Sequence, residues 1–84
     1  MADFQLQIYT QEAKVLDERV SSIVVPGAEG YLGVWAHHAP LVSTLGEGKL
    51  TIRKATEIRE HHVAGGFLEV RANTATLLVD RFEE

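Results

Sequence analysis

The chain of 84 residues is long enough for one small domain, and its 45% hydrophobic and 24% charged residues are typical of globular proteins. The absence of cysteine excludes a disulfide scaffold, a cysteine-based zinc site and a thiol nucleophile. The net charge of −4 argues against nucleic-acid binding, which needs a positive surface to displace counterions from phosphates.

Hydrophobic residues recur with a period of two along most of the chain, which predicts β-strands with one buried side and one solvent-facing side. We expect about eight short strands, in chain order at residues 4–9, 20–25, 31–35, 41–45, 50–53, 57–64, 67–71 and 74–80. Turn-forming residues punctuate them at Pro26-Gly27, Gly46-Glu47-Gly48 and Ala72-Asn73. This pattern predicts an all-β sandwich or barrel.

Residues 54–62 have the composition of a helix but contain only one large apolar residue, Ile58. A helix there would have no apolar face to bury, so a polar edge strand or hairpin fits better. The N-terminus carries no secretory or transit signal, which makes a cytoplasmic location the default expectation. Apolar runs such as Ile23-Val24-Val25 fall far short of the roughly 20 residues that span a bilayer, so membrane association would come through a partner.

Two glycine-containing segments invite a phosphate-binding interpretation. Before Gly48-Lys49, Ser43 stands where a phosphate-binding loop needs its first glycine, and Leu50 stands where it needs a hydroxyl. Residues 27–33 carry glycines in a G-x-x-G-x-x-G spacing, without the helix that would support a pyrophosphate. Both segments are better explained as turns, and we expect no cofactor.

The four histidines form two adjacent pairs, His37-His38 and His61-His62. Adjacent residues of a strand point to opposite faces, so neither pair can easily chelate one metal. One histidine from each pair could meet across a sandwich, with Glu60 or Glu69 adding a carboxylate. This leaves open an alternative function, a small cupin-like metal enzyme with His and Glu ligands.

The segment PGAEGYLGV at residues 26–34, followed by HAPL at residues 38–41, resembles a known family. It is similar to the epsilon subunit of F-type ATP synthases, whose mitochondrial equivalent is called delta. Matching blocks follow in order along nearly the whole chain: GKLTI at 48–52, VAGGFLEV at 63–70 and TLLVD at 76–80.

The resemblance implies one domain over residues 1–84, a small two-sheet antiparallel β-sandwich. It implies a non-catalytic subunit of the rotor's central stalk that binds the gamma subunit and the c-ring, with indirect contact to the alpha/beta head. This subunit couples proton or sodium flow to ATP synthesis. The expected location is the cytoplasmic or plastid stromal face of the membrane, with membrane association only through the complex and no nucleic-acid partner.

The resemblance also assigns contact residues. The turn at Glu29, Gly30 and Tyr31 matches the loop that faces the c-ring, and His38 lies in the segment near gamma. Tyr31 stands where the family usually has an acid, which Glu29 could replace. Trp35 adds an aromatic side chain on the gamma side, where the family usually has a Leu-Pro pair.

Family members usually continue into a C-terminal pair of helices that carries the inhibitory arm and, in some members, an ATP-binding motif. This sequence stops just after Asp80, where the sandwich is expected to end. The resemblance therefore implies a subunit that couples and assembles, without inhibition through inserted helices and without ATP binding.

Overall fold

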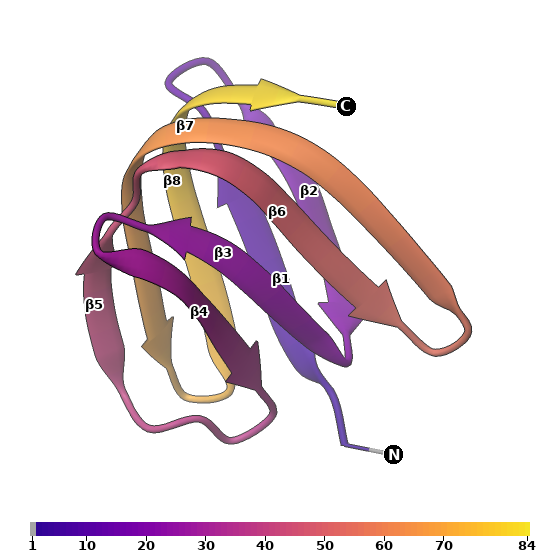
Figure 1. Cartoon of the computed structure of the whole chain (residues 1–84). Coiled ribbons are helices and arrows are strands. Elements are labelled where there is room, and N and C mark those ends of the chain that lie inside the picture. The colour runs from indigo at the N-terminus through magenta and orange to yellow at the C-terminus, as the bar shows by residue number, and fades with distance from the viewer. Residues whose placement is uncertain (1) are drawn as a thin grey trace.

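The computed structural model describes residues 2–84, and within them it contains eight β-strands (Figure 1). The strands are β1 (Phe4–Tyr9), β2 (Lys14–Val20), β3 (Ser22–Gly27), β4 (Gly30–Trp35), β5 (Leu41–Thr44), β6 (Glu47–Lys54), β7 (Glu57–Arg71) and β8 (Thr74–Glu83).

The strands form one hydrogen-bonded sheet that folds over on itself into two layers (Figure 1). The order is β2-β1-β8-β7-β6-β3-β4, and β5 pairs with β7. β3, β4 and β6 make the front layer of the figure, while β1, β2, β5 and most of β8 lie behind them. The expected all-β sandwich is confirmed, and its neighbouring strands are antiparallel except β1 and β8, which pair in parallel.

The core lies between the two layers and is built by the period-two pattern. Phe4, Leu6 and Ile8 of β1 are almost fully buried, whereas the residues between them are half-buried on the outer side. The same alternation buries the other inward-facing residues: Val20, Ile23, Val25, Val34, Leu45, Leu50, Ile52, Val63, Leu68, Val70, Ala75, Leu77 and Val79. Because apolar side chains from the two layers interdigitate and pack closely, the sandwich is stiff.

The strand expected at residues 20–25 is β3, but it begins two residues later, at Ser22, and ends at Gly27. Val20 is the last residue of β2 and pairs with Phe4, while Ser22 opens β3, so Ser21 is where the chain leaves one layer for the other. The sequence did not indicate β2 as a strand of its own. Its pattern is mostly polar, because β2 is an edge strand with few buried positions.

Two of the three expected turns are displaced. Pro26 and Gly27 belong to β3, and the turn lies at Ala28-Glu29. Gly46 alone interrupts the chain, since Glu47 already pairs with Ala64 in β6 and β7. The turn at Ala72-Asn73 is confirmed, and both residues have positive φ angles (51° and 58°), as a tight two-residue hairpin turn requires.

The two strands expected at residues 57–64 and 67–71 are one long strand, β7, which bends at Gly65-Gly66. Both glycines have positive φ, 69° and 111°. Buried side chains fall at odd positions before the bend (Val63) and at even positions after it (Leu68, Val70). The bend therefore lets β7 face the same core from both layers.

Candidate partner-binding surface

The β3–β4 hairpin carries the three residues expected to face the c-ring. Gly27 pairs with Gly30 across the two-residue turn, and Gly30 takes a φ of 135° that favours glycine. The hairpin is held to the segment that leads from β5 to β6 of the same chain. The Ala28 amide donates to the Thr44 carbonyl (3.1 Å), and the Gly46 amide donates to the Pro26 carbonyl (2.8 Å). The tip is thus a supported, exposed turn.

Tyr31 lies on the outer face of β4, opposite Pro26 of β3. Its hydroxyl oxygen accepts a hydrogen bond from the Lys49 amide at 3.1 Å, and 60% of its surface stays exposed. A Cβ atom at Gly48 would lie 2.5 Å from this hydroxyl, so glycine there makes room for the ring. Tyr31 is therefore a fixed aromatic surface whose hydroxyl oxygen already accepts one hydrogen bond.

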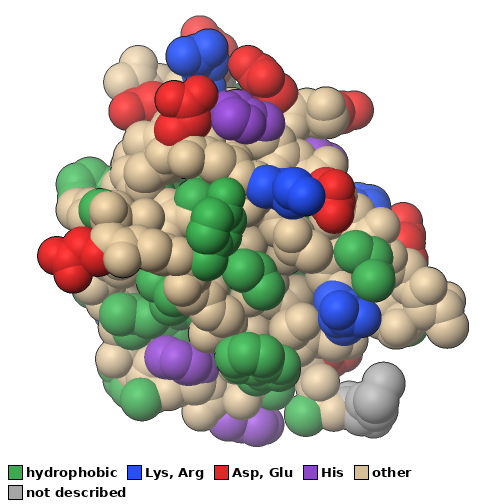
Figure 2. Space-filling model, in the orientation of Figure 1, with side chains coloured by type: hydrophobic (Ala, Val, Ile, Leu, Met, Phe, Trp, Pro, Cys, Tyr) green, Lys and Arg blue, Asp and Glu red, His purple; other side chains and the backbone are tan. Residues whose placement is uncertain are grey.

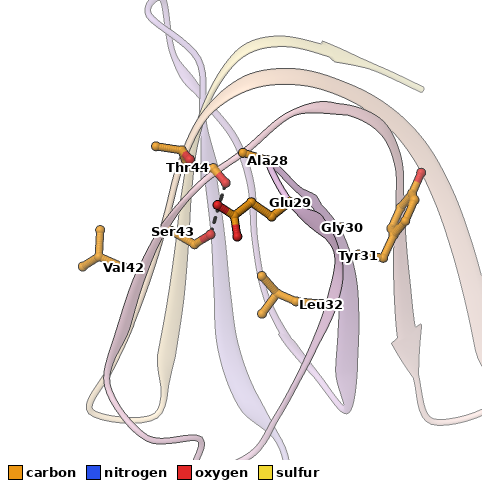
Figure 3. Close-up of a pocket in the computed structure, with 9 residues that line it drawn as sticks. Ala28, Glu29, Gly30, Tyr31, Leu32, Val42, Ser43 and Thr44 are labelled. Atoms are coloured by element: carbon orange, nitrogen blue, oxygen red, sulfur yellow. Dashed lines mark hydrogen bonds between the residues drawn. The ribbon is translucent and has the colours of Figure 1, made fainter.

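The Glu29 side chain lies on the side of the hairpin opposite to Tyr31 (Figure 3). Its carboxylate points toward Ser43 across a shallow depression of about 430 Å³ between the hairpin and β5, whereas Tyr31 lies on the opposite side of β4. The structure thus places Glu29, Gly30 and Tyr31 in one hairpin but does not bring the two side chains together.

Trp35 lies on the same outer face of β4 as Tyr31. Gly33 lies between them on that face, two residues from each. The indole ring of Trp35 folds back over Gly33, where a Cβ atom would lie 2.7 Å from the ring. The ring is nevertheless 61% exposed. Figure 2 shows hydrophobic side chains on this face with charged groups around them, a composition found at protein interfaces.

His38 lies in the loop between β4 and β5, where its Nδ1 atom is 2.7 Å from the Ala39 carbonyl oxygen. Asn73 anchors this loop, because its Oδ1 accepts from the His37 amide (2.8 Å) and its Nδ2 donates to the Asp3 carbonyl (3.0 Å). The sequence analysis assigned Asn73 only to a turn. Its role in holding three segments together has no sequence signal.

A second exposed apolar set, also missed from the sequence, lies on the outer face of the other layer. Phe67 of β7 pairs with Leu78 of β8, and both are about half exposed (53% and 47%). Val42 of β5, which pairs with Glu69 of β7 two residues beyond Phe67, is exposed as well. The alternation did contain a signal, since these apolar residues fall at positions expected to face solvent.

An ion-pair cluster joins the layers at the end near β2. The Glu18 carboxylate of β2 contacts Arg59 of β7 at 2.6 Å and Lys54 of β6 at 2.8 Å. Hydrogen bonds from Arg59, and then from Lys54, hold the pKa of Glu18 below its ordinary value, and the same carboxylate raises the pKa of Arg59. This cluster resists sliding of one layer over the other.

The histidine pairs do not form the ligand set of the metal-enzyme alternative. Within residues 2–84, no group of three His, Cys, Asp or Glu side chains is placed to hold a metal ion. His61 packs on the Phe82 ring with centroids 4.8 Å apart, while His62 lies 3.0 Å from the Glu47 carboxylate. No helix long and apolar enough to cross a membrane occurs in the described part of the chain.

Fold and surface together define a small β-sandwich with a supported turn at one end and exposed aromatic rings on one strand, the kind of domain that engages protein surfaces. Comparison with known proteins names the family. The sequence model of the ATP synthase Delta/Epsilon chain, beta-sandwich domain, matches residues 3–84, and the chain belongs to this family.

Curated relatives carry the name ATP synthase epsilon chain. The Leptospira borgpetersenii protein is 44% identical over 75 residues, covering 89% of this chain and 59% of its own. The Caldicellulosiruptor bescii protein is 41% identical over 83 residues, covering 99% of this chain and 61% of its own. The chain thus spans about three fifths of the length of these relatives.

Two solved structures have the same fold. A chain in the cryo-EM structure of the Euglena gracilis mitochondrial ATP synthase, OSCP/F1/c-ring, superposes with a TM-score of 0.91 at 25% identity, covering 98% of this chain and 53% of that one. A chain in the Tetrahymena thermophila mitochondrial ATP synthase, central stalk/c-ring, gives a TM-score of 0.82 at 22% identity, covering 95% and 65%.

Proposed function

We propose that this chain is a non-catalytic central-stalk subunit of a proton- or sodium-translocating F-type ATP synthase. It binds the gamma subunit and the c-ring and couples ion flow to ATP synthesis, with residues 1–84 acting as one sandwich domain. The observation that carries this proposal is the family match over residues 3–84, together with the TM-score of 0.91 to a chain of a c-ring-containing complex.

A subunit that transmits torque has to be rigid, and the physical properties of the sandwich support this role. Its core is continuous between the layers, and the Glu18 cluster ties them together at one end. The β3–β4 hairpin is hydrogen-bonded near its tip, through Pro26 and Ala28, to the segment around Thr44 and Gly46. Force applied at the hairpin tip would therefore pass into the sandwich without bending a free loop.

Within this proposal, the hairpin tip with Glu29, Gly30 and Tyr31 contacts the c-ring. Trp35 and His38 contact gamma. The exposed rings of Tyr31 and Trp35 share one outer face of β4, so the two contacts are adjacent and the subunit can bridge its partners. The subunit is peripheral, on the cytoplasmic or plastid stromal face of the membrane, and is held there only by the complex.

A pull-down with the gamma subunit of the same source tests the proposal. Trp35→Ala should weaken binding by about tenfold or more, as for a central aromatic interface residue, and His38→Ala should weaken it less. Val42→Ala, which changes an apolar side chain that is also exposed (71%) but lies on the other layer, is the control and should leave binding unchanged. Failure of the unmodified chain to bind gamma would refute the proposed function.

A matched experiment addresses the c-ring contact. A complex of gamma with purified c-ring should retain the chain more strongly than gamma alone, and Tyr31→Ala should remove that gain without lowering affinity for gamma alone. If Tyr31→Ala lowers affinity for both equally, the hairpin tip does not face the c-ring.

A further inference from the structure

A groove on the outer face of the front layer, with a volume of about 440 Å³, lies beside Trp35. Val24 and Ser22 of β3 form its floor, and Thr51 and Arg53 of β6 form the wall opposite Trp35. It is separate from the depression that holds Glu29, because that one opens between the hairpin and β5.

Strand register fixes the dimensions of this groove. Ser22 pairs with Trp35 on one side and with Arg53 on the other. Neighbouring strands are about 4.8 Å apart, so the backbones that carry Trp35 and Arg53 are about 10 Å apart. Ser22 is small and only 8% exposed, which leaves a hollow between the two large side chains.

One wall of the groove is apolar and held in place. The indole of Trp35 rests on Gly33, and Val24 lies opposite Gly33 in the adjacent strand. The ring therefore presents an aromatic surface to the groove without having to move. Binding an apolar side chain there costs little conformational entropy, because the ring is already positioned.

The other wall carries a cation that lacks a partner. In residues 2–84, the side chain of Arg53 makes neither an ion pair nor a hydrogen bond, whereas the side chains of neighbouring Lys49 and Lys54 are paired with Glu60 (3.6 Å) and Glu18 (2.8 Å). The hydroxyl groups of Ser22 and Thr51 are likewise without hydrogen-bond partners among the described residues. Together they offer a guanidinium and two hydroxyl donors.

We propose that this groove binds an extended acidic segment of a partner protein, with a carboxylate on Arg53 and an aliphatic side chain against Trp35. Side chains two residues apart in an extended segment point the same way and are about 6.6 Å apart, and their own length spans the remaining distance. Lys49, 3.6 Å from Glu60, offsets part of the negative charge of Glu60 next to the groove. The groove includes Trp35, so the inference rests on the same face that the proposed function assigns to gamma and specifies the chemistry of the segment bound there; the isolated chain is enough to test it.

Trp35 is the single tryptophan of the chain, so its fluorescence reports on the groove directly. The probe is the blocked peptide Ac-Leu-Glu-Leu-Glu-NH2, and its uncharged counterpart Ac-Leu-Gln-Leu-Gln-NH2 is the control. We expect a saturable change with the acidic peptide and a dissociation constant of about 1 mM, as for a short segment with one ion pair. Arg53→Gln should weaken binding about tenfold.

Arg71→Gln is the matched variant, because Arg71 also lacks an ion pair in the described part of the chain but does not line the groove. It should bind the acidic peptide as the unmodified chain does. Equal binding of both peptides, equal loss in the two arginine variants, an equal response to inorganic phosphate, or no saturable change up to about 10 mM would overturn the proposal. None of these outcomes depends on binding to gamma, so the two proposals can fail separately.

Discussion

Replacing Gly66 with alanine should destabilise the sandwich more than the same change at any other glycine with positive φ. An added Cβ atom at Gly66 would lie 1.8 Å from the Leu78 carbonyl oxygen, while real Cβ contacts essentially never fall below 3.0 Å. β7 and β8 must therefore separate by at least 1.2 Å (3.0 minus 1.8), at the bend where β7 passes between the layers (Figure 1).

The magnitude has two parts. Forcing a residue with a side chain into a φ of 111° costs about 1–3 kcal/mol. Breaking the Gly66–Val79 pairing leaves backbone groups without partners inside the sheet, for about 1–3 kcal/mol more. The sum, about 2–6 kcal/mol, is a large part of the roughly 4–13 kcal/mol expected for a chain of this length.

Gly30 supplies the matched control. It also has a positive φ, 135°, but a Cβ atom there would meet nothing within 4 Å. Gly30→Ala should cost only the strain, about 1–3 kcal/mol. Urea unfolding followed by circular dichroism measures both, with the midpoint reporting stability and the slope checking that unfolding stays two-state. If Gly66→Ala costs no more than Gly30→Ala, the close approach to Leu78 does not constrain the fold.

Three further predictions concern single side chains. Glu18→Gln should lower the free energy of unfolding by about 1–3 kcal/mol at pH 7. The effect should shrink as the pH falls below 4.5, the ordinary pKa of Glu, because Arg59 and Lys54 hold the folded pKa of Glu18 below that value. Leu77→Ala should cost about 2–5 kcal/mol in urea unfolding, since Leu77 is fully buried. Tyr31→Phe should speed hydrogen exchange of the Lys49 amide, because it removes the acceptor of that amide.

Each of these has a control. Glu83→Gln removes a carboxylate that pairs with Arg81 at the exposed surface, so it should change stability by less than about 0.5 kcal/mol. Leu78→Ala, next to Leu77 but half exposed, should cost well under the buried change. Tyr9→Phe should leave the Lys49 exchange rate unaltered. A Glu18→Gln effect that does not shrink as the pH falls below 4.5 would contradict the ion-pair explanation, and equal costs at residues 77 and 78 would contradict the assigned register.

The placement of the proposed contact residues was only partly predictable. Glu29, Gly30 and Tyr31 were expected to act together, and they do share a hairpin. Which side of β4 each side chain occupies depends on the register of β3 with β4, and the sequence carried no information on that. The groove beside Trp35 was unpredictable for the same reason, because Ser22 and Arg53 lie far apart in the chain and meet Trp35 only through strand pairing.

The sequence by itself determined the all-β class and most of the core. Alternation is local, and a strand such as β1 shows which of its faces is apolar without reference to any neighbour. Length, lack of cysteine and acidic charge excluded several classes of function on equally local grounds. Motifs near residues 26–41 and 63–70 indicated the family, because turns and glycines at fixed positions are also local features.

Only the tertiary structure decided where the layers begin and end. Ser21 switches layers although nothing in its neighbours signals it, and Gly65-Gly66 turns two expected strands into one because β8 passes close beside them. The exposed Trp35 could equally be a core residue on sequence grounds, since hydrophobicity alone does not reveal which side of a strand is covered. Whether a strand face is buried depends on which strand and which layer pack against it, and these are set only by long-range strand pairing.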